Sequence, residues 1–277
     1  MRAHSNPALR VLPLVIAATC MVLALPAASA AEAGFRQVTV TRAAGEKPAH
    51  FALYYPTADV ARVIPMGPFP QTVAINGAPA LAVKGLIVIS HGTASTELGF
   101  ATLAQALARN GYLVASVEHV GDTWQDQSMR ATPGRYFAER PRQVSRVIDT
   151  VLADPLWSSR IGQGADGRPL IGAIGHSAGG YTVLALAGGK PVLSRLRAHC
   201  ETEAALDPVL CKLSHGIGSA SVQAGGAADA QEEPVQADPR VRADQGHAGA
   251  KINLEAVLAQ PDAVNPKAVE GTLDPAE

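Results

Sequence analysis

Residues 170–180, LIGAIGHSAGG, contain a serine where its hydroxyl could act as a nucleophile. Residues 170–174 form a short apolar run of strand type, and residues 181–187 continue as an apolar helix. The five residues 175–179 between them fit the pattern Gly-x-Ser-x-Gly, with Ser177 at the centre. Strand, sharp turn and helix in this order are the context of a nucleophile elbow, so the sequence predicts that Ser177 attacks an electrophilic carbon.

The residue types around Ser177 agree with this interpretation. The nucleophile must hold a strained conformation on a tight turn, and Gly175 and Gly179 lack the Cβ atoms that would crowd the strand and the helix. A helix that opens at Ala178 presents free N–H groups and a partial positive charge beside the hydroxyl. The alternative is a glycine-rich strand–helix turn without chemistry. The predicted strand and helix on either side favour the elbow.

A second strand end could stabilise the charge that such an attack creates. Residues 85–90 read as a buried strand, and His91, Gly92 and Thr93 follow directly. An attack on a carbonyl carbon needs N–H donors for the developing oxyanion, one from this loop and one from the residue after the nucleophile. We therefore expect the backbone N–H groups of Thr93 and Ala178 to form the oxyanion hole. Alone, His91-Gly92 would be read as an ordinary turn at a strand end.

Composition excludes several other classes of function. The 277 residues are consistent with one domain, and 47% hydrophobic residues can fill a core. The formal net charge of −1 carries no basic stripe, so no nucleic-acid partner is expected. The sequence contains no zinc-spaced Cys/His cluster and no phosphate-binding glycine loop. We therefore expect neither a metal ion nor an organic cofactor.

The N-terminus has the features of a signal peptide over residues 1–30. Arg2 and Arg10 give a positive start, residues 11–25 are apolar, and residues 28–30 (Ala-Ser-Ala) form a small-residue cleavage site. The apolar run is short for a membrane span, and no second candidate span follows. Cleavage near Ala30 would release a periplasmic or secreted protein without a membrane span.

Two cysteines follow the predicted cleavage site. Cys200 and Cys211 form an even set in a compartment that is oxidising, which favours a disulfide between them. Two buried free thiols are the alternative, and they are less common in an exported protein.

The remaining sequence alternates between strand-like and helix-like segments, which predicts an α/β fold with a mostly parallel sheet covered by helices on both faces. Residues 56–84 read as irregular and residues 124–139 as a loop. His119 and Asp122 follow a strand at the end where open α/β sheets bind ligands, and we expect them to shape the rim of a pocket. The predicted strands cover residues 35–42, 50–55, 86–90, 112–117 and 170–174, and the predicted helices cover residues 97–110, 140–154 and 181–187.

These stretches resemble the α/β-hydrolase superfamily, and within it bacterial dienelactone-hydrolase-like proteins related to platelet-activating-factor acetylhydrolase. The resemblance implies a serine hydrolase of carboxylic esters, acting on a small acyl or lipid ester without a cofactor. It also implies a histidine, oriented by an acid, that takes the proton of Ser177. The resemblance rests on residues 86–92, 111–123, 140–149, 175–181, 200, 211 and 238–243.

The sequence departs from the family after residue 243. The family continues with buried strands that carry a triad acid and a late histidine. Nothing in residues 244–277 resembles a buried strand: residues 252–258 are at best a short helix, and residues 264–277 are polar and contain prolines. We therefore expect an incomplete α/β-hydrolase domain over residues 31–243 that lacks its C-terminal strands, and a poorly ordered tail over residues 244–277, as after a truncation or a frameshift. His215 and His247 both read as solvated loop residues, so the triad acid and base stay unassigned.

The sequence thus predicts an exported serine hydrolase that cleaves a carboxylic ester through an acyl-enzyme on Ser177. Two alternatives stay open. One is a catalytically impaired, truncated homologue with at most a binding role. The other is a peptidase or an acyltransferase on the same fold, which the elbow alone does not distinguish from an esterase.

Overall fold

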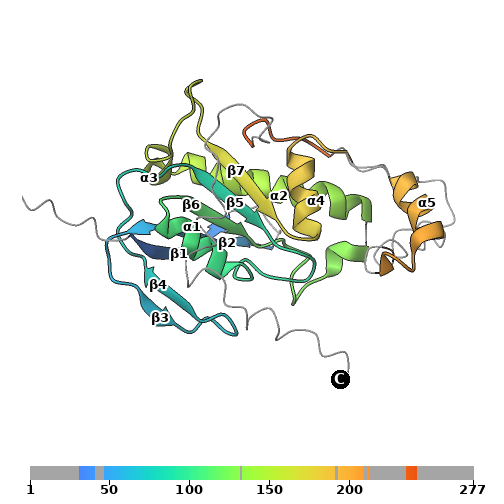
Figure 1. Cartoon of the computed structure of the whole chain (residues 1–277), viewed down its shortest axis with the longest axis horizontal. Helices are drawn as coiled ribbons and strands as arrows, with labels where there is room; N and C mark the ends of the chain where they lie inside the picture. The colour runs from blue at the N-terminus through green and yellow to red at the C-terminus, as the bar shows by residue number, and fades with distance from the viewer. Residues whose placement is uncertain are drawn as a thin grey trace, which may run out of the picture.

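Seven strands form one sheet in the computed structural model, which describes residues 31–40, 47–131, 133–190, 193–208, 211 and 235–241. The order across the sheet is β3-β4-β1-β2-β6-β5-β7 (Figure 1). The predicted signal peptide (1–30) and tail (244–277) lie outside the described residues. The strands are β1 (Glu32–Val40), β2 (Ala49–Thr57), β3 (Arg62–Ile64), β4 (Gln71–Ile75), β5 (Leu86–Ser90), β6 (Leu113–Val117) and β7 (Ile171–Gly175).

The half of the sheet that leads to Ser177 is parallel. Leu86 of β5 is in register with Leu113 of β6 on one side and with Ile171 of β7 on the other. β2 runs antiparallel to both of its neighbours, β1 and β6. The strand order and the sharp turn into a helix after β7 confirm the predicted α/β-hydrolase fold. The sheet is mixed and not mostly parallel as predicted, because three of its six strand pairings are antiparallel.

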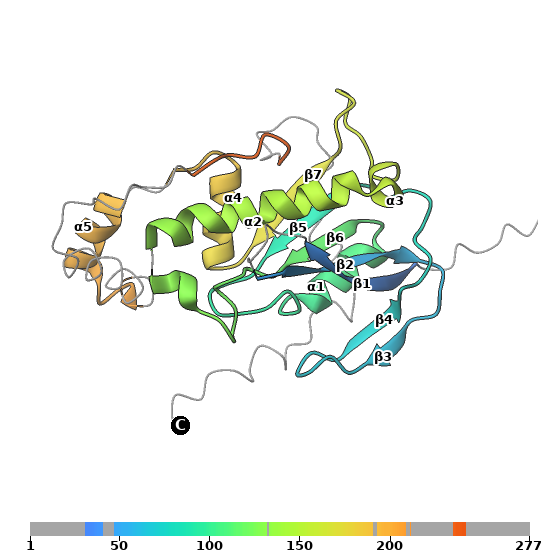
Figure 2. The ribbon, with the colours of Figure 1, turned by 180° about the vertical axis from the view of Figure 1, so that it is seen from behind.

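Helices cover both faces of the sheet (Figures 1 and 2). On β5, Leu86 and Val88 join one core cluster, which includes residues of α2 and α4, while Ile87 and Ile89 join the other, which includes residues of α1. Because alternate side chains are buried on opposite faces, β5 is apolar throughout. The helices are α1 (Ala101–Arg109), α2 (Pro133–Ala153), α3 (Pro155–Ser158), α4 (Ala178–Leu186) and α5 (Leu193–Glu203), with a short 3-10 turn η1 (Ser128–Ala131).

The prediction of irregular structure over residues 56–84 was wrong in part. This segment contains β3 and β4, and β4 pairs in parallel with β1, Gly34 opposite Ala74. Both strands are short and lie between prolines and glycines, so their local sequence resembles a loop. Their place in the sheet depends on a partner strand some 40 residues earlier, which a local pattern does not contain.

The loop predicted over residues 124–139 was also wrong in part, because α2 begins at Pro133 and continues through Pro141. A proline inside a helix cannot donate to the carbonyl four residues earlier, here that of Phe137. The hydroxyl of Tyr181 on α4 donates to the Phe137 carbonyl oxygen instead, at 3.0 Å. A side chain from the neighbouring helix therefore satisfies the acceptor that the proline leaves open.

Residues 235–241 lie against the end of the described sheet. Val241 is buried and forms an isolated parallel bridge with Ile171 of β7. Arg240 pairs with Asp238 at 2.7 Å and with Asp149 of α2 at 2.5 Å. These contacts hold the segment on α2, at the point where the resemblance places the start of the next strand.

Cys200 of α5 and Cys211 form a disulfide in the structure, with sulfur atoms 2.11 Å and Cα atoms 5.3 Å apart. This is the pair that the cysteine count favoured. In the described ranges, no helix is both long enough and apolar enough to cross a membrane.

Candidate active site

Ser177 has the backbone conformation of a nucleophile elbow. It lies between β7 and α4 with φ 52° and ψ −118°. Asn76, Ala94 and Ser177 are the three non-glycine residues with positive φ among those described, and such a conformation is strained for a residue with a Cβ. Its side chain is exposed, as a nucleophile that meets substrate must be.

The two glycines of the pattern are required by close backbone approach. A Cβ added to Gly175 would lie 2.1 Å from the Gly179 carbonyl oxygen. A Cβ added to Gly179 would lie 1.9 Å from the carbonyl oxygen of Ser90 at the end of β5. The nearest atom to a Cβ on Gly180 would be 3.7 Å away. Only the two glycines of the motif therefore need to be glycine for the elbow to close onto β5.

The loop after β5 lies directly against the elbow. A Cβ added to Gly92 would be 3.4 Å from Ser177 Cβ, and the amide of His176 donates to the carbonyl of Ser90 at 3.3 Å. Within the described part of the chain, the N–H groups of Thr93 and Ala178 have no hydrogen-bond acceptor. The structure thus brings together the two segments that carry the predicted nucleophile and both predicted oxyanion donors.

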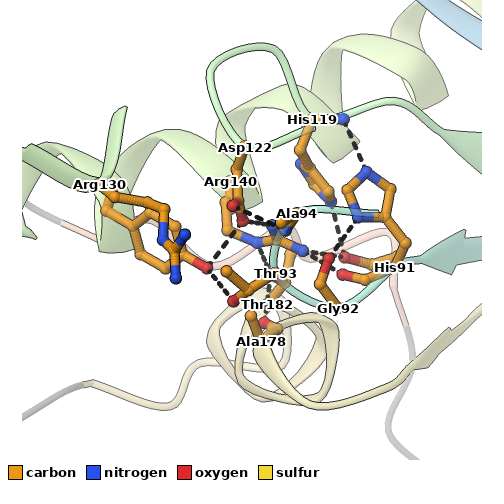
Figure 3. A network of polar contacts seen from close by, with 12 residues as sticks. His91, Gly92, Thr93, Ala94, His119, Asp122, Arg130, Arg140, Ala178 and Thr182 are labelled. Atoms are coloured by element: carbon orange, nitrogen blue, oxygen red, sulfur yellow. Dashed lines mark hydrogen bonds and ion pairs between the residues drawn. The ribbon is translucent and has the colours of Figure 1, made fainter. Parts of the chain in front are cut away.

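A buried ion pair lies behind this loop (Figure 3). The guanidinium of Arg140 on α2 contacts the carboxylate of Asp122, and both side chains are fully buried. Asp122 Oδ1 accepts the amide N–H of Ala94 at 3.1 Å, and its Oδ2 accepts the hydroxyl of Tyr136 at 2.8 Å. The loop after β5 is therefore bound to a charged group that has no contact with solvent.

His119 belongs to the same buried network, and its ring nitrogens are both occupied. Nδ1 lies 3.0 Å from Gln143 Oε1, and Gln143 Nε2 donates to the Val120 carbonyl, so the amide oxygen must accept and Nδ1 carries the proton. Nε2 then accepts the hydroxyl of Ser90 at 2.7 Å. A neutral histidine bound in this way supports the loop from behind and is not available to Ser177.

His91 is fixed in the neutral state as well. Its Nε2 accepts the amide N–H of His119 at 3.1 Å, so the proton lies on Nδ1, which donates to the Gly92 carbonyl at 2.6 Å. Burial lowers the pKa of His91 to about 4, and the charge of Arg140 acts in the same direction. Burial, followed by Arg140 and His91, also lowers the pKa of His119 well below its ordinary value.

A general base for Ser177 is not found in the described ranges. None of their histidines makes a hydrogen bond with Ser177 Oγ, and His176 instead points an exposed ring toward Phe100, with ring centroids 5.7 Å apart. His215 and His247 lie outside the described residues. No group of three or more histidine, cysteine or acidic side chains in the described residues could hold a metal ion.

Sequence reasoning missed Tyr136, whose hydroxyl contacts Thr93 of the loop, and Arg140, which contacts Thr182 of α4. One signal was present. Arg140 lies four residues before Val144, on the same face as the buried Val147 and Ile148. An arginine on the apolar face of a helix indicates a buried charge with a partner.

The chain matches no protein-family model and no curated protein. It is similar to several solved structures. A ferulic acid esterase from Streptomyces cinnamoneus has 21% identity and a TM-score of 0.46, over 60% of this chain and 57% of that one. A dienelactone hydrolase from Anabaena variabilis has 14% identity and a TM-score of 0.36, over 56% of each chain. A dienelactone hydrolase-like promiscuous phosphotriesterase from metagenomic libraries has 15% identity and a TM-score of 0.36, over 57% of this chain and 56% of that one. The similarity thus spans slightly over half the length of these structures.

Proposed function

We propose that the chain is an exported serine hydrolase that cleaves a carboxylic ester through an acyl-enzyme on Ser177. The observation that carries the proposal is the conformation of Ser177, with φ 52° on a strand–helix turn closed by Gly175 and Gly179. The adjacent loop after β5 adds the N–H group of Thr93, and Ala178 follows Ser177 directly in the chain. A nucleophile and two oxyanion donors from separate segments serve acyl transfer together.

In the proposed reaction, Ser177 Oγ bonds to the ester carbonyl carbon, and the carbonyl electrons move to the oxygen. The N–H groups of Thr93 and Ala178 stabilise this oxyanion. As it collapses, the bond to the leaving alcohol breaks, and the alcohol leaves with the proton that Ser177 gave up. Water then attacks the acyl-enzyme and releases the acid. None of the described histidines makes a hydrogen bond with Ser177, so the residue that carries the proton stays unassigned.

A small acyl or lipid ester is the proposed substrate class, on the basis of the sequence resemblance. Export is proposed from the signal-peptide features of residues 1–30, and peptide mapping without reductant checks the Cys200–Cys211 bond in protein recovered from the periplasm. The proposed chemistry uses side chains and backbone groups only.

The test is turnover of p-nitrophenyl acetate and butyrate by the full chain after signal cleavage, beside Ser177→Ala and His247→Ala. We expect hydrolysis that is lost in Ser177→Ala, and covalent labelling of Ser177 by a fluorophosphonate. Loss of activity in His247→Ala as well would assign the base to that residue. Labelling of another serine, or no turnover by the parent protein, would overturn the proposal.

Two further substrates separate the related activities on the same protein. Faster cleavage of an anilide than of the matched ester would indicate a peptidase. Ester formation with an added alcohol in preference to hydrolysis would indicate an acyltransferase.

A further inference from the structure

We propose that Arg140, Tyr136 and Thr182 are positioning residues that set the two halves of the oxyanion hole relative to each other. The inference rests on the proposed function of Ser177, Thr93 and Ala178. It follows from the hydrogen bonds that Arg140 makes with two different segments of the site.

Arg140 connects the oxyanion loop to the elbow helix. One of its terminal nitrogens donates to the His91 carbonyl, at the start of the loop, and its Nε donates to Thr182 Oγ1 at 3.0 Å. The Thr182 hydroxyl in turn donates to the carbonyl of Ala178 at 2.9 Å. One guanidinium therefore contacts both segments that supply the oxyanion N–H groups (Figure 3).

Tyr136 fixes the residue that carries the first donor. Its hydroxyl donates its one proton to Asp122 Oδ2 at 2.8 Å, so the Thr93 hydroxyl, 3.0 Å away, must donate to the Tyr136 oxygen. The Thr93 hydroxyl hydrogen is thereby directed toward Tyr136. The donor that Thr93 can offer to an oxyanion is then its backbone N–H.

Asp122 completes the connection between these contacts. It binds Arg140 and Tyr136 with its side chain, and it accepts the N–H of Ala94, which has a φ of 56°. The loop is thus held at His91, Thr93 and Ala94 by one buried cluster, which has charged groups at its centre. A displacement of about 1 Å between donor and oxyanion can reduce the rate roughly a hundredfold.

The side chains of the cluster are buried, as expected of residues that fix the positions of the loop and the elbow. Arg140, Asp122 and Thr182 have no exposed surface, and Tyr136 is 9% exposed. None of the four is placed to touch a substrate, so each would act through the loop or the elbow. Their removal should change the rate of the chemical step more than the binding of the ground state.

The experiment compares Tyr136→Phe and Thr182→Val with Thr182→Ser and Tyr181→Phe. Tyr136→Phe removes the contact with Thr93, and Thr182→Val removes the hydroxyl between Arg140 and Ala178. Thr182→Ser keeps that hydroxyl. Tyr181→Phe removes a 3.0 Å hydrogen bond between the same two helices, α2 and α4, that does not involve the loop.

We expect kcat for p-nitrophenyl butyrate to fall about tenfold to a hundredfold in Tyr136→Phe and Thr182→Val, with KM nearly unchanged. Thr182→Ser and Tyr181→Phe should keep the parent kcat. An equal fall of kcat in Tyr181→Phe would overturn the proposal, because the effect would then come from weaker packing between α2 and α4 and not from the contacts with the loop. Unchanged kcat in Tyr136→Phe and Thr182→Val would overturn the proposal.

Hydrogen exchange supplies a readout that does not need turnover. The amide of Ala94 should exchange faster in Tyr136→Phe than in the parent or in Tyr181→Phe, because its acceptor Asp122 loses a partner. If the parent protein has no esterase activity, the proposed function fails, and the exchange of Ala94 alone judges whether the cluster holds the loop. Equal exchange in all three proteins would then overturn the positioning role.

Discussion

The two sides of the proposed oxyanion hole are held in different ways. On the loop side, Asp122, Arg140 and His119 are fully buried, and hydrogen bonds to them fix the backbone of residues 91–94. On the elbow side, Ser177 is exposed, and its hydroxyl has no hydrogen-bond partner in the described ranges. The elbow receives the Arg140 contact only through Thr182, and its turn is held by the close approach of its backbone to β5 at Gly179.

This difference predicts that substitutions on the two sides will affect the structure to different extents. Contacts between backbone atoms cannot relax around an added Cβ, so a substitution on the elbow side should displace β7 and α4 together. Polar contacts on the loop side can be removed one at a time, and the remaining members of the cluster can still hold part of the geometry. The following substitutions test this comparison from the largest effect to the smallest.

Gly179→Ala should have the largest effect. Its Cβ would lie 1.9 Å from the Ser90 carbonyl oxygen, so β5 or the elbow must move. We expect a loss of about 4–5 kcal/mol in the free energy of unfolding, or failure to fold. The matched control is the neighbouring Gly180→Ala, which meets nothing closer than 3.7 Å and should stabilise helix α4 by up to about 1 kcal/mol. Equal urea midpoints for the two variants would contradict the conclusion that close backbone approach at Gly179 holds the elbow.

Asp122→Ala should follow. It leaves the charge of Arg140 buried without its carboxylate, and such a loss costs about 3–5 kcal/mol. The control is Lys47→Ala, which removes the exposed 2.7 Å pair with Asp126 and should cost less than about 1 kcal/mol. Urea denaturation of both variants measures the difference. A change below about 1 kcal/mol in the free energy of unfolding of Asp122→Ala would mean that the buried ion pair between Arg140 and Asp122 does not stabilise the loop side.

The elbow could be predicted from the sequence because its constraints are local. Gly175, Ser177 and Gly179 lie within five residues, and the apolar runs on either side show the strand and the helix directly. The parallel strand β5 was predicted at its observed bounds for the same reason, since it is apolar without interruption. The proposed oxyanion donors, Thr93 and Ala178, follow from the positions of these two segments.

The loop-side cluster could not be predicted because its contacts join residues far apart in the chain. Arg140 and Thr182 are separated by 42 residues, and Arg140 and Ser90 by 50. The expectation that His119 and Asp122 lie at a pocket rim was wrong, because both are fully buried against Gln143 and Arg140 of α2. That helix begins seven residues earlier than its apolar pattern indicated, because Tyr136 and Arg140 are buried polar residues on its first turns.

The two buried histidines should make stability depend on pH. The pKa of His91 falls from 6.5 to about 4 on folding, and that of His119 falls in the same direction. The unfolded chain therefore binds more protons below pH 6.5, and stability is lost as the pH decreases from there toward 4. The slope from each histidine approaches about 1.4 kcal/mol per pH unit in this range.

Replacing these rings tests the assignment. In His91→Asn with His119→Gln, the free energy of unfolding should change less between pH 7 and pH 4.5 than in the parent, whatever its value at pH 7. Urea denaturation at several pH values measures both slopes. Parallel slopes would show that other groups, and not the histidines behind the loop, cause the acid sensitivity.

The smallest effect concerns the contact that joins α2 to α4 outside the cluster. Tyr181→Phe removes the hydroxyl that donates to the Phe137 carbonyl, which Pro141 leaves without a helical donor. We expect a loss of about 1 kcal/mol in the free energy of unfolding. In a Pro141→Ala background, the new N–H of residue 141 can donate to the same carbonyl, so Tyr181→Phe should then have almost no effect. A double-mutant cycle measures this coupling, which should be about 1 kcal/mol. If Tyr181→Phe is equally destabilising in both backgrounds, its hydroxyl does not substitute for the missing donor, and the helices α2 and α4 are joined at this point by ring packing alone.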